Sequence, residues 1–206
     1  MDLTVHITAF VTLLVVIDPI GLAPMFVALT AGADKSHRRA IALRACGISI
    51  LLLTLFGLFG EAVLGFAGIT LPAFRIAGGI LLFLTALDML FERRTKRRKG
   101  QKSSGDDPSV FPLATPLIAG PGSIATMILL TGQADDAAGI FAVHLVMFAV
   151  IVIVLIFFLA AGLLERILGE TGINVVTRLL GMLLAALSVQ FVLDGLTSYG
   201  LATGLG

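Results

Sequence analysis

Asp18-Pro19-Ile20-Gly21-Leu22-Ala23-Pro24 interrupts the first apolar stretch of the chain, and Thr115-Pro116-Leu117-Ile118-Ala119-Gly120-Pro121 interrupts the fourth. Each proline lacks a backbone N–H and clashes with the carbonyl group four residues earlier, so a helix through it must kink or unwind. Inside a bilayer, freed backbone groups persist only where protein or a polar cavity satisfies them. Paired breaks in the two halves of a membrane protein are typical of a transporter binding site.

The composition indicates a membrane protein. Hydrophobic residues make up 58% of the 206 residues and charged residues 13%, and the mean hydropathy is +1.07. Each apolar stretch exceeds the ~17 to 20 residues that cross a bilayer as a helix. We therefore expect an all-α membrane protein with six transmembrane helices, the first and fourth broken at the proline motifs. The stretches are 3–32, 38–60, 71–91, 110–132, 138–164 and 175–199.

An internal repeat divides the chain. Besides the recurring Pro-x4-Pro, the motif that starts at Glu61 recurs from Glu165, and the motif that starts at Arg75 recurs from Arg178. Because each unit holds an odd number of helices, the second must enter the membrane from the opposite side, which predicts two inverted three-helix repeats. We place the repeats at 1–91 and 110–206, joined by a basic and polar linker at 92–109. Glycine pairs such as 57/60 and 78/79 favour close helix contacts.

The positive charges predict the orientation. Of the 14 Lys and Arg residues, all but Arg75 fall near three alternate loops. The positive-inside rule places these loops in the cytoplasm and both termini outside. The basic stretch Arg93–Lys102 fits this topology signal, with contact to lipid head groups, better than nucleic-acid binding.

Asp18 is the first candidate site residue. It lies about 22 Å along the first helix at ~1.5 Å per residue, near the bilayer centre. A carboxylate there costs about 2.5–3.5 kcal/mol unless it is protonated, paired or hydrated. One interpretation is an N-cap for a half-helix at 20–30; the other is a cation site formed with Pro19, Gly21 and Pro24. The two roles are compatible, because a capped break exposes the same polar groups to a cavity.

The second break carries no charge. Gly120, Pro121 and Gly122 open a half-helix, with Ser123 as a candidate cap and Thr126 one turn further along. A helix N-terminus presents free N–H groups and the positive end of the dipole, which suits a carboxylate. Asp18 suits an ammonium group, H⁺ or Na⁺. Together the two breaks match a small zwitterionic solute.

Arg75 and Arg178 are expected to open the third and sixth helices. Either they extend to the membrane interface, or they form a structural ion pair or gate with the repeated Glu61 and Glu165. The sequence lacks the zinc-protease, phosphate-loop, serine-hydrolase and dinucleotide motifs. We therefore expect no enzyme activity, no cofactor and no metal site.

Three segments carry a family resemblance: 18–26, 72–79 and 116–126. With them the chain resembles the MarC family of bacterial integral membrane proteins, which includes SnatA-type small neutral amino acid transporters. One departure is Leu22, where family members often carry Asn. The resemblance implies six helices, a location in the bacterial inner membrane and, for one branch, uptake of glycine and alanine.

The leading interpretation is a secondary transporter of small neutral amino acids coupled to H⁺ or Na⁺. Two alternatives stay open: efflux of another small solute, and a membrane scaffold or stress-linked protein without transport. The paired breaks favour transport, because a scaffold need not maintain polar backbone at the bilayer centre. The sequence sets neither the substrate nor the oligomeric state.

Overall fold

The computed structural model describes residues 3–30, 32–91 and 107–200. Within these ranges the chain is helical and has no strand. The linker stretch 92–106, with its basic run, and the last six residues lie outside the described part. The prediction of an all-α protein is confirmed for the rest.

The first expected helix consists of two pieces, α1 (Leu3–Ile17) and α2 (Pro19–Leu29), separated by Asp18. Pro19 is the first residue of α2, where its missing N–H costs no helical hydrogen bond. Pro24 lies inside α2 without ending it. The break predicted for this helix therefore arises at Pro19 alone.

The fourth expected helix is also broken. An irregular helical segment, η1 (Ser109–Ile118), is followed by α6 (Pro121–Thr131), and the two are bent by 54°. Pro121 starts α6 as Pro19 starts α2, and both half-helices have 11 residues. In structural terms Pro19 thus matches Pro121, whereas the sequence comparison aligned it with Pro116.

Four longer helices complete the fold: α3 (Lys35–Phe66), α4 (Leu71–Leu90), α7 (Ala137–Leu159) and α8 (Ala161–Ser198). Asp34 and Asp136 cap α3 and α7 by accepting backbone N–H groups at 2.9 and 2.8 Å. Helix α8 starts earlier than expected and kinks at Gly169, whose φ of 62° suits glycine. Its apolar span is Thr171–Ser198.

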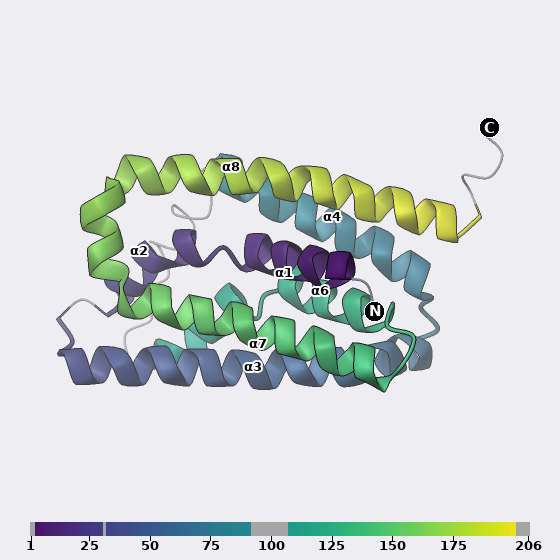
Figure 1. Ribbon diagram of the computed structural model, residues 1–206, viewed down its shortest axis with the longest axis horizontal. Helices are drawn as coiled ribbons and strands as arrows, with labels where there is room; N and C mark the ends of the chain where they lie inside the picture. Colours follow the sequence, from purple (N-terminus) through teal and green to yellow (C-terminus); the bar gives the residue numbers. More distant parts are fainter. Residues whose placement is uncertain (1–2, 31, 92–106, 201–206) are drawn as a thin grey trace.

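Among the described residues, five spans are long and apolar enough to cross a membrane when α1 and α2 count as one, and the bent pair η1–α6 makes six if it also counts as one. The broken helices lie in the middle of the bundle, between α3 with α7 and α4 with α8 (Figure 1). In the span Thr4–Leu29, 56% of the most apolar window is buried, against 22–39% in the other four. Large apolar side chains such as Phe59 and Leu183 are exposed on the outside, as expected for lipid contact.

Glycine permits the close packing of α4 against α8, as the sequence predicted for this residue type. A Cβ on Gly79 would lie 2.8 Å from the carbonyl oxygen of Ser188, and one on Gly195 would lie 3.0 Å from that of Pro72. A Cβ on Gly181 would lie 3.0 Å from the Cβ of Met89. These pairs show that the two helices run antiparallel with their backbones almost in contact.

Candidate functional site

The first break is built around a left-handed residue. Asp18 adopts φ 54° and ψ 67°, is 1% exposed, and accepts the backbone N–H of Gly21 through Oδ1 at 3.0 Å. Aspartate is one of the few side chains that tolerates this conformation, and Pro19 fixes the start of the next helix. The predicted capping role is confirmed.

Gly21 is required by the position of the carboxylate. A Cβ at residue 21 would lie 2.1 Å from Oδ2 of Asp18 and 3.1 Å from Oγ1 of Thr177. The carboxylate of Asp18 thus occupies the space where a side chain at residue 21 would begin, next to the hydroxyl of Thr177 from α8. Sequence reasoning missed Thr177, since only the packing of α8 against α2 brings it here. Pro24 lies further along α2, away from this point.

At the second break, the Ser123 side chain hydrogen-bonds to backbone groups just before the start of α6. Gly120 is the N-cap of α6, and its N–H donates to Ser123 Oγ at 2.9 Å. The Ser123 hydroxyl in turn lies 2.6 Å from the carbonyl oxygen of Ile118. Ser123 is therefore not the N-cap residue, which is Gly120. It is the third helical residue, and its hydroxyl accepts the N–H of the cap as in a capping box.

The first turn of α6 contains two N–H groups that donate to no backbone carbonyl in the part of the chain that the structure describes. Pro121 has no N–H, and within the described residues the N–H groups of Gly122 and Ser123 meet no backbone acceptor. Thr126 is fully buried and donates its hydroxyl to the carbonyl of Gly122 at 2.9 Å. Thr126 therefore supports this turn from within and does not offer its hydrogen to a ligand.

The two breaks lie close together. A Cβ on Gly122 would be 3.3 Å from Cγ1 of Val16, which precedes Asp18 by two residues, and 3.2 Å from Cδ2 of Leu82 on α4. The first break meets α8 through Thr177, and the second meets α4 through Leu82. Both predicted halves of the site therefore adjoin the α4–α8 pair.

The two arginines lie apart from this centre. Arg75 is near the start of α4 and its guanidinium reaches Ser198 Oγ at 3.5 Å, and among the described residues it makes no ion pair with Glu61. Arg178 is exposed near the other end of the antiparallel pair. The side chain of Glu165 is outside the described part. The structure does not bring the arginines together.

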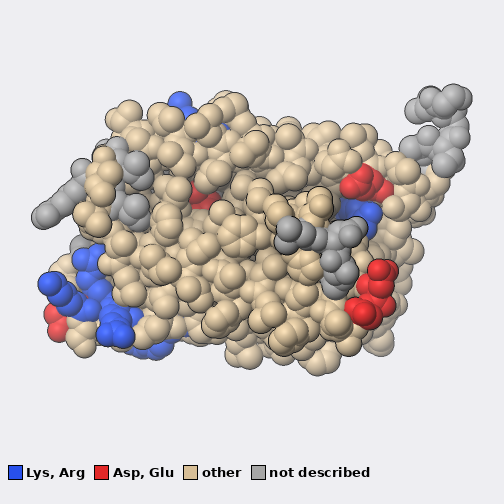
Figure 2. All heavy atoms as spheres, in the orientation of Figure 1, with Lys and Arg blue, Asp and Glu red and all other residues tan. Residues whose placement is uncertain are grey.

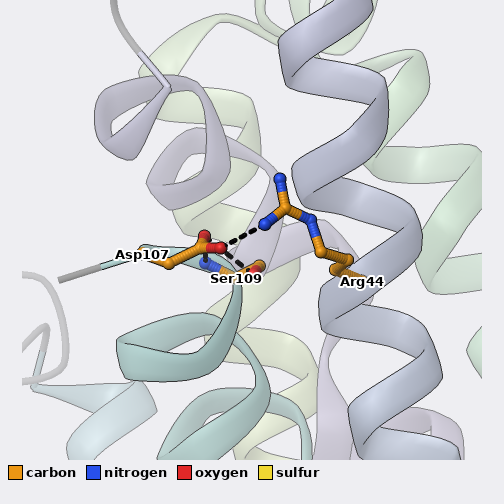
Figure 3. Close-up of polar contacts among 3 residues, drawn as sticks. All are labelled: Arg44, Asp107 and Ser109. Carbon is orange, nitrogen blue, oxygen red and sulfur yellow. Dashed lines mark hydrogen bonds and ion pairs between the residues drawn. The ribbon is translucent and has the colours of Figure 1, made fainter.

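An ion pair joins the first half to the last residues of the linker, at the end of the bundle where α3 begins. Arg44 of α3 pairs with Asp107, which also accepts the N–H and hydroxyl of Ser109 at 3.0 and 2.8 Å (Figure 3). These two hydrogen bonds, with Arg44, lower the pKa of Asp107. The pair anchors the start of η1 to α3. On the face shown in Figure 2, most Lys and Arg atoms lie at this end, and the larger groups of Asp and Glu atoms lie at the opposite end beside a smaller basic group.

A bundle of apolar helices, with its most buried helices broken at its centre, defines an integral membrane protein. The chain belongs to the MarC family: the model of that family, described as MarC family integral membrane protein, matches residues 3–199. This confirms the resemblance found in the sequence.

Relatives cover almost the whole chain. A UPF0056 membrane protein of Aquifex aeolicus is 39% identical over 195 residues, which are 92% of this chain and 91% of that protein. A UPF0056 membrane protein of Methanocaldococcus jannaschii is 38% identical over 201 residues, 95% and 98% of the two chains. The UPF0056 inner membrane protein YhgN of Escherichia coli is 35% identical over 192 residues, 92% and 95%. No solved structure matches the chain.

Proposed function

We propose that this protein is a secondary transporter of small neutral amino acids of the glycine and alanine type, coupled to H⁺ or Na⁺. One observation carries the proposal: an acidic break and an amide-rich break lie side by side in the middle of the bundle. Asp18 supplies negative charge for an ammonium group or a coupling cation. The first turn of α6 supplies N–H groups and a positive dipole end for a carboxylate.

The energetics support a functional role for Asp18. Its side chain is 1% exposed, and an aspartate at the centre of a membrane helix costs about 2.5–3.5 kcal/mol. A cap on α2 does not need a charge, because Asn and Ser cap a helix about as well as Asp. Capping therefore does not require the negative charge, and a transported cation is a ligand that this charge suits.

We further propose that the halves 1–91 and 110–206 are inverted repeats joined by the linker 92–109. The packing supports this. The pair α1–α2 contacts α7 and α8, while the pair η1–α6 contacts α3 and α4; α3 also packs on α7, and α4 on α8. If each helix is replaced by its equivalent in the other half, the same set of helix contacts results. In such a repeat the equivalent breaks approach the midplane from opposite faces, as alternating access requires.

The proposed location is the inner membrane of a bacterial cell, with both termini outside. The relative in Escherichia coli is named an inner membrane protein, and the described basic residues concentrate where α3 begins. The positive-inside rule assigns that end to the cytoplasm. Arg75 and Arg178, at opposite ends of the α4–α8 pair, would then flank the two entrances.

The two alternative functions would use the two helix breaks differently. Efflux of another small solute keeps the breaks and changes only the chemistry of the ligand and the direction of flux. A membrane scaffold without transport gains nothing from a charged residue at the midpoint of the most buried span. The observed centre therefore favours a transport function over a scaffold.

Purified protein in liposomes provides the test. Labelled glycine, alanine and serine are offered under an inward Na⁺ gradient, an inward H⁺ gradient, or no gradient. We expect one gradient to drive accumulation of at least one of these amino acids above the level in protein-free liposomes. Uptake no greater than in protein-free liposomes under all three conditions would refute the amino acid proposal.

A further inference from the structure

The hydroxyl group of Thr177 points toward the first break. Oγ1 of Thr177 lies 3.1 Å from the position that a Cβ of Gly21 would occupy, and Oδ2 of Asp18 lies 2.1 Å from that same position. The two oxygens come from different helices, α8 and the α1–α2 junction. Both oxygens therefore lie on the same side of Gly21.

Thr177 differs from other threonines of the protein in how its hydroxyl is used. Six threonines in helices or at a helix end donate to the carbonyl oxygen four residues earlier; they are Thr8, Thr30, Thr85, Thr126, Thr131 and Thr197. The oxygen of Thr177 is buried and has no hydrogen-bond partner among the described residues. A buried hydroxyl left unsatisfied costs free energy. A side chain that forgoes the local bond and faces a carboxylate is placed to contact a ligand.

The chemistry of the two groups selects the ligand. A carboxylate and a hydroxyl both present hard oxygen atoms, which bind Na⁺ by coordination and a primary ammonium group by accepting its N–H bonds. A negatively charged ligand is disfavoured by the carboxylate. A neutral apolar ligand would leave the Thr177 hydroxyl unsatisfied. A small monovalent cation satisfies both groups.

We propose that Thr177 and Asp18 together bind a small monovalent cation beside Gly21, so that one ligand bridges the two halves of the chain. The cation is either the coupling Na⁺ or the ammonium group of the substrate. This inference rests on the proposed transport function and adds α8 to the site. Because Asp18 belongs to the first half and Thr177 to the second, binding at this point links the two halves directly.

Thermal unfolding of the detergent-purified protein measures binding without transport. The probes are NaCl, methylammonium chloride and glycine, each compared with choline chloride at equal ionic strength. We expect the wild type to be stabilised by Na⁺ or by methylammonium. Protection by Na⁺ alone identifies a coupling-ion site, and protection by methylammonium and glycine without Na⁺ identifies the substrate ammonium. Stabilisation by neither cation would overturn the inference.

Variants of Thr177 test its hydroxyl. Thr177→Val keeps the shape and removes the hydroxyl, and we expect it to weaken cation binding about three- to tenfold, the effect of one lost hydrogen-bonding group. Thr177→Ser should restore most of the affinity. Thr131→Val is the matched control, since the hydroxyl of buried Thr131 is bonded to the carbonyl of Met127 at 2.9 Å, and it should leave the affinity unchanged.

The results separate this inference from the proposed function. Wild-type affinity in Thr177→Val overturns the role of Thr177 even if the protein transports amino acids. Cation binding that depends on Thr177, in a protein that transports none of the tested amino acids, retains the inference and refutes the proposed substrates. If Thr177→Val fails to fold, the affinity of Thr177→Ser decides, and a loss equal to that of Thr177→Ala would refute a role for the hydroxyl.

Discussion

Replacing Asp18 separates its structural role from its charge. The residue combines a left-handed backbone, a cap on Gly21 at 3.0 Å and a buried carboxylate. Asn tolerates the left-handed conformation and caps as well as Asp, so Asp18→Asn should change stability by no more than ~1 kcal/mol. Gly keeps the backbone without the cap. Ala loses the cap and strains the backbone, at about 2–3 kcal/mol in total.

These energies convert into melting temperatures. For a chain of this length 1 kcal/mol shifts the midpoint by roughly 2–4 °C, so Asp18→Ala should unfold about 4–12 °C lower than the wild type, with Asp18→Gly between Ala and Asn. Transport should behave differently. Asn, Gly and Ala all remove the charge, and all should abolish uptake in liposomes, whereas Asp18→Glu should retain part of it.

The comparison of the two measurements is decisive. A capping role alone predicts that uptake follows stability, with Asp18→Asn close to the wild type and Asp18→Ala poorly folded. An Asn variant that inserts, melts like the wild type and transports normally would remove the carboxylate from the mechanism. Normal uptake by Asp18→Gly would do the same.

Three further predictions concern the packing, the second break and the topology. Gly79→Ala places a Cβ 2.8 Å from a carbonyl oxygen of α8 and should destabilise the protein by about 1–3 kcal/mol in thermal unfolding, whereas Gly65→Ala, with open space around it, should be neutral or stabilising. Pro121→Ala combined with Gly122→Ala should let η1 and α6 join and reduce uptake before expression falls; normal uptake would make the break a packing feature only. A reporter active only in the cytoplasm, fused after Gly206, should be silent, and activity there would reverse the proposed orientation.

The sequence predicted the features that depend on local chemistry. Asp18-Pro19 identified the break in the first helix. A proline removes a backbone donor and an aspartate caps a helix regardless of the tertiary surroundings. The cap on Gly21 followed from the same reasoning. The existence and class of the helices followed from the apolar stretches. Their ends were less accurate: α3 extends to Phe66, well beyond the last residue of its apolar stretch.

The features that the sequence did not predict depend on contacts between distant segments. An ion pair with Glu61 was one of the two interpretations of Arg75, but its guanidinium reaches Ser198 of α8 instead. Thr177 carries no local signal, since a threonine in an apolar helix ordinarily bonds its own backbone. The sequence indicated a capping role for Ser123 but not its position: Gly120 takes the N-cap position, and Ser123 bonds to the cap from the third helical position.

The close contact between α4 and α8 has a consequence for biogenesis. At a synthesis rate of about 5–20 residues per second, Ser188 leaves the ribosome roughly 5–20 s after Gly79, the residue of α4 that it contacts. During that interval the glycine face of α4 lacks α8, and the carboxylate of Asp18 lacks Thr177 of the same helix. A nascent chain that ends at residue 91 therefore contains every helix of the first half without the surface against which it packs. We therefore expect the newly inserted half to be recognised by membrane quality control until the second half arrives.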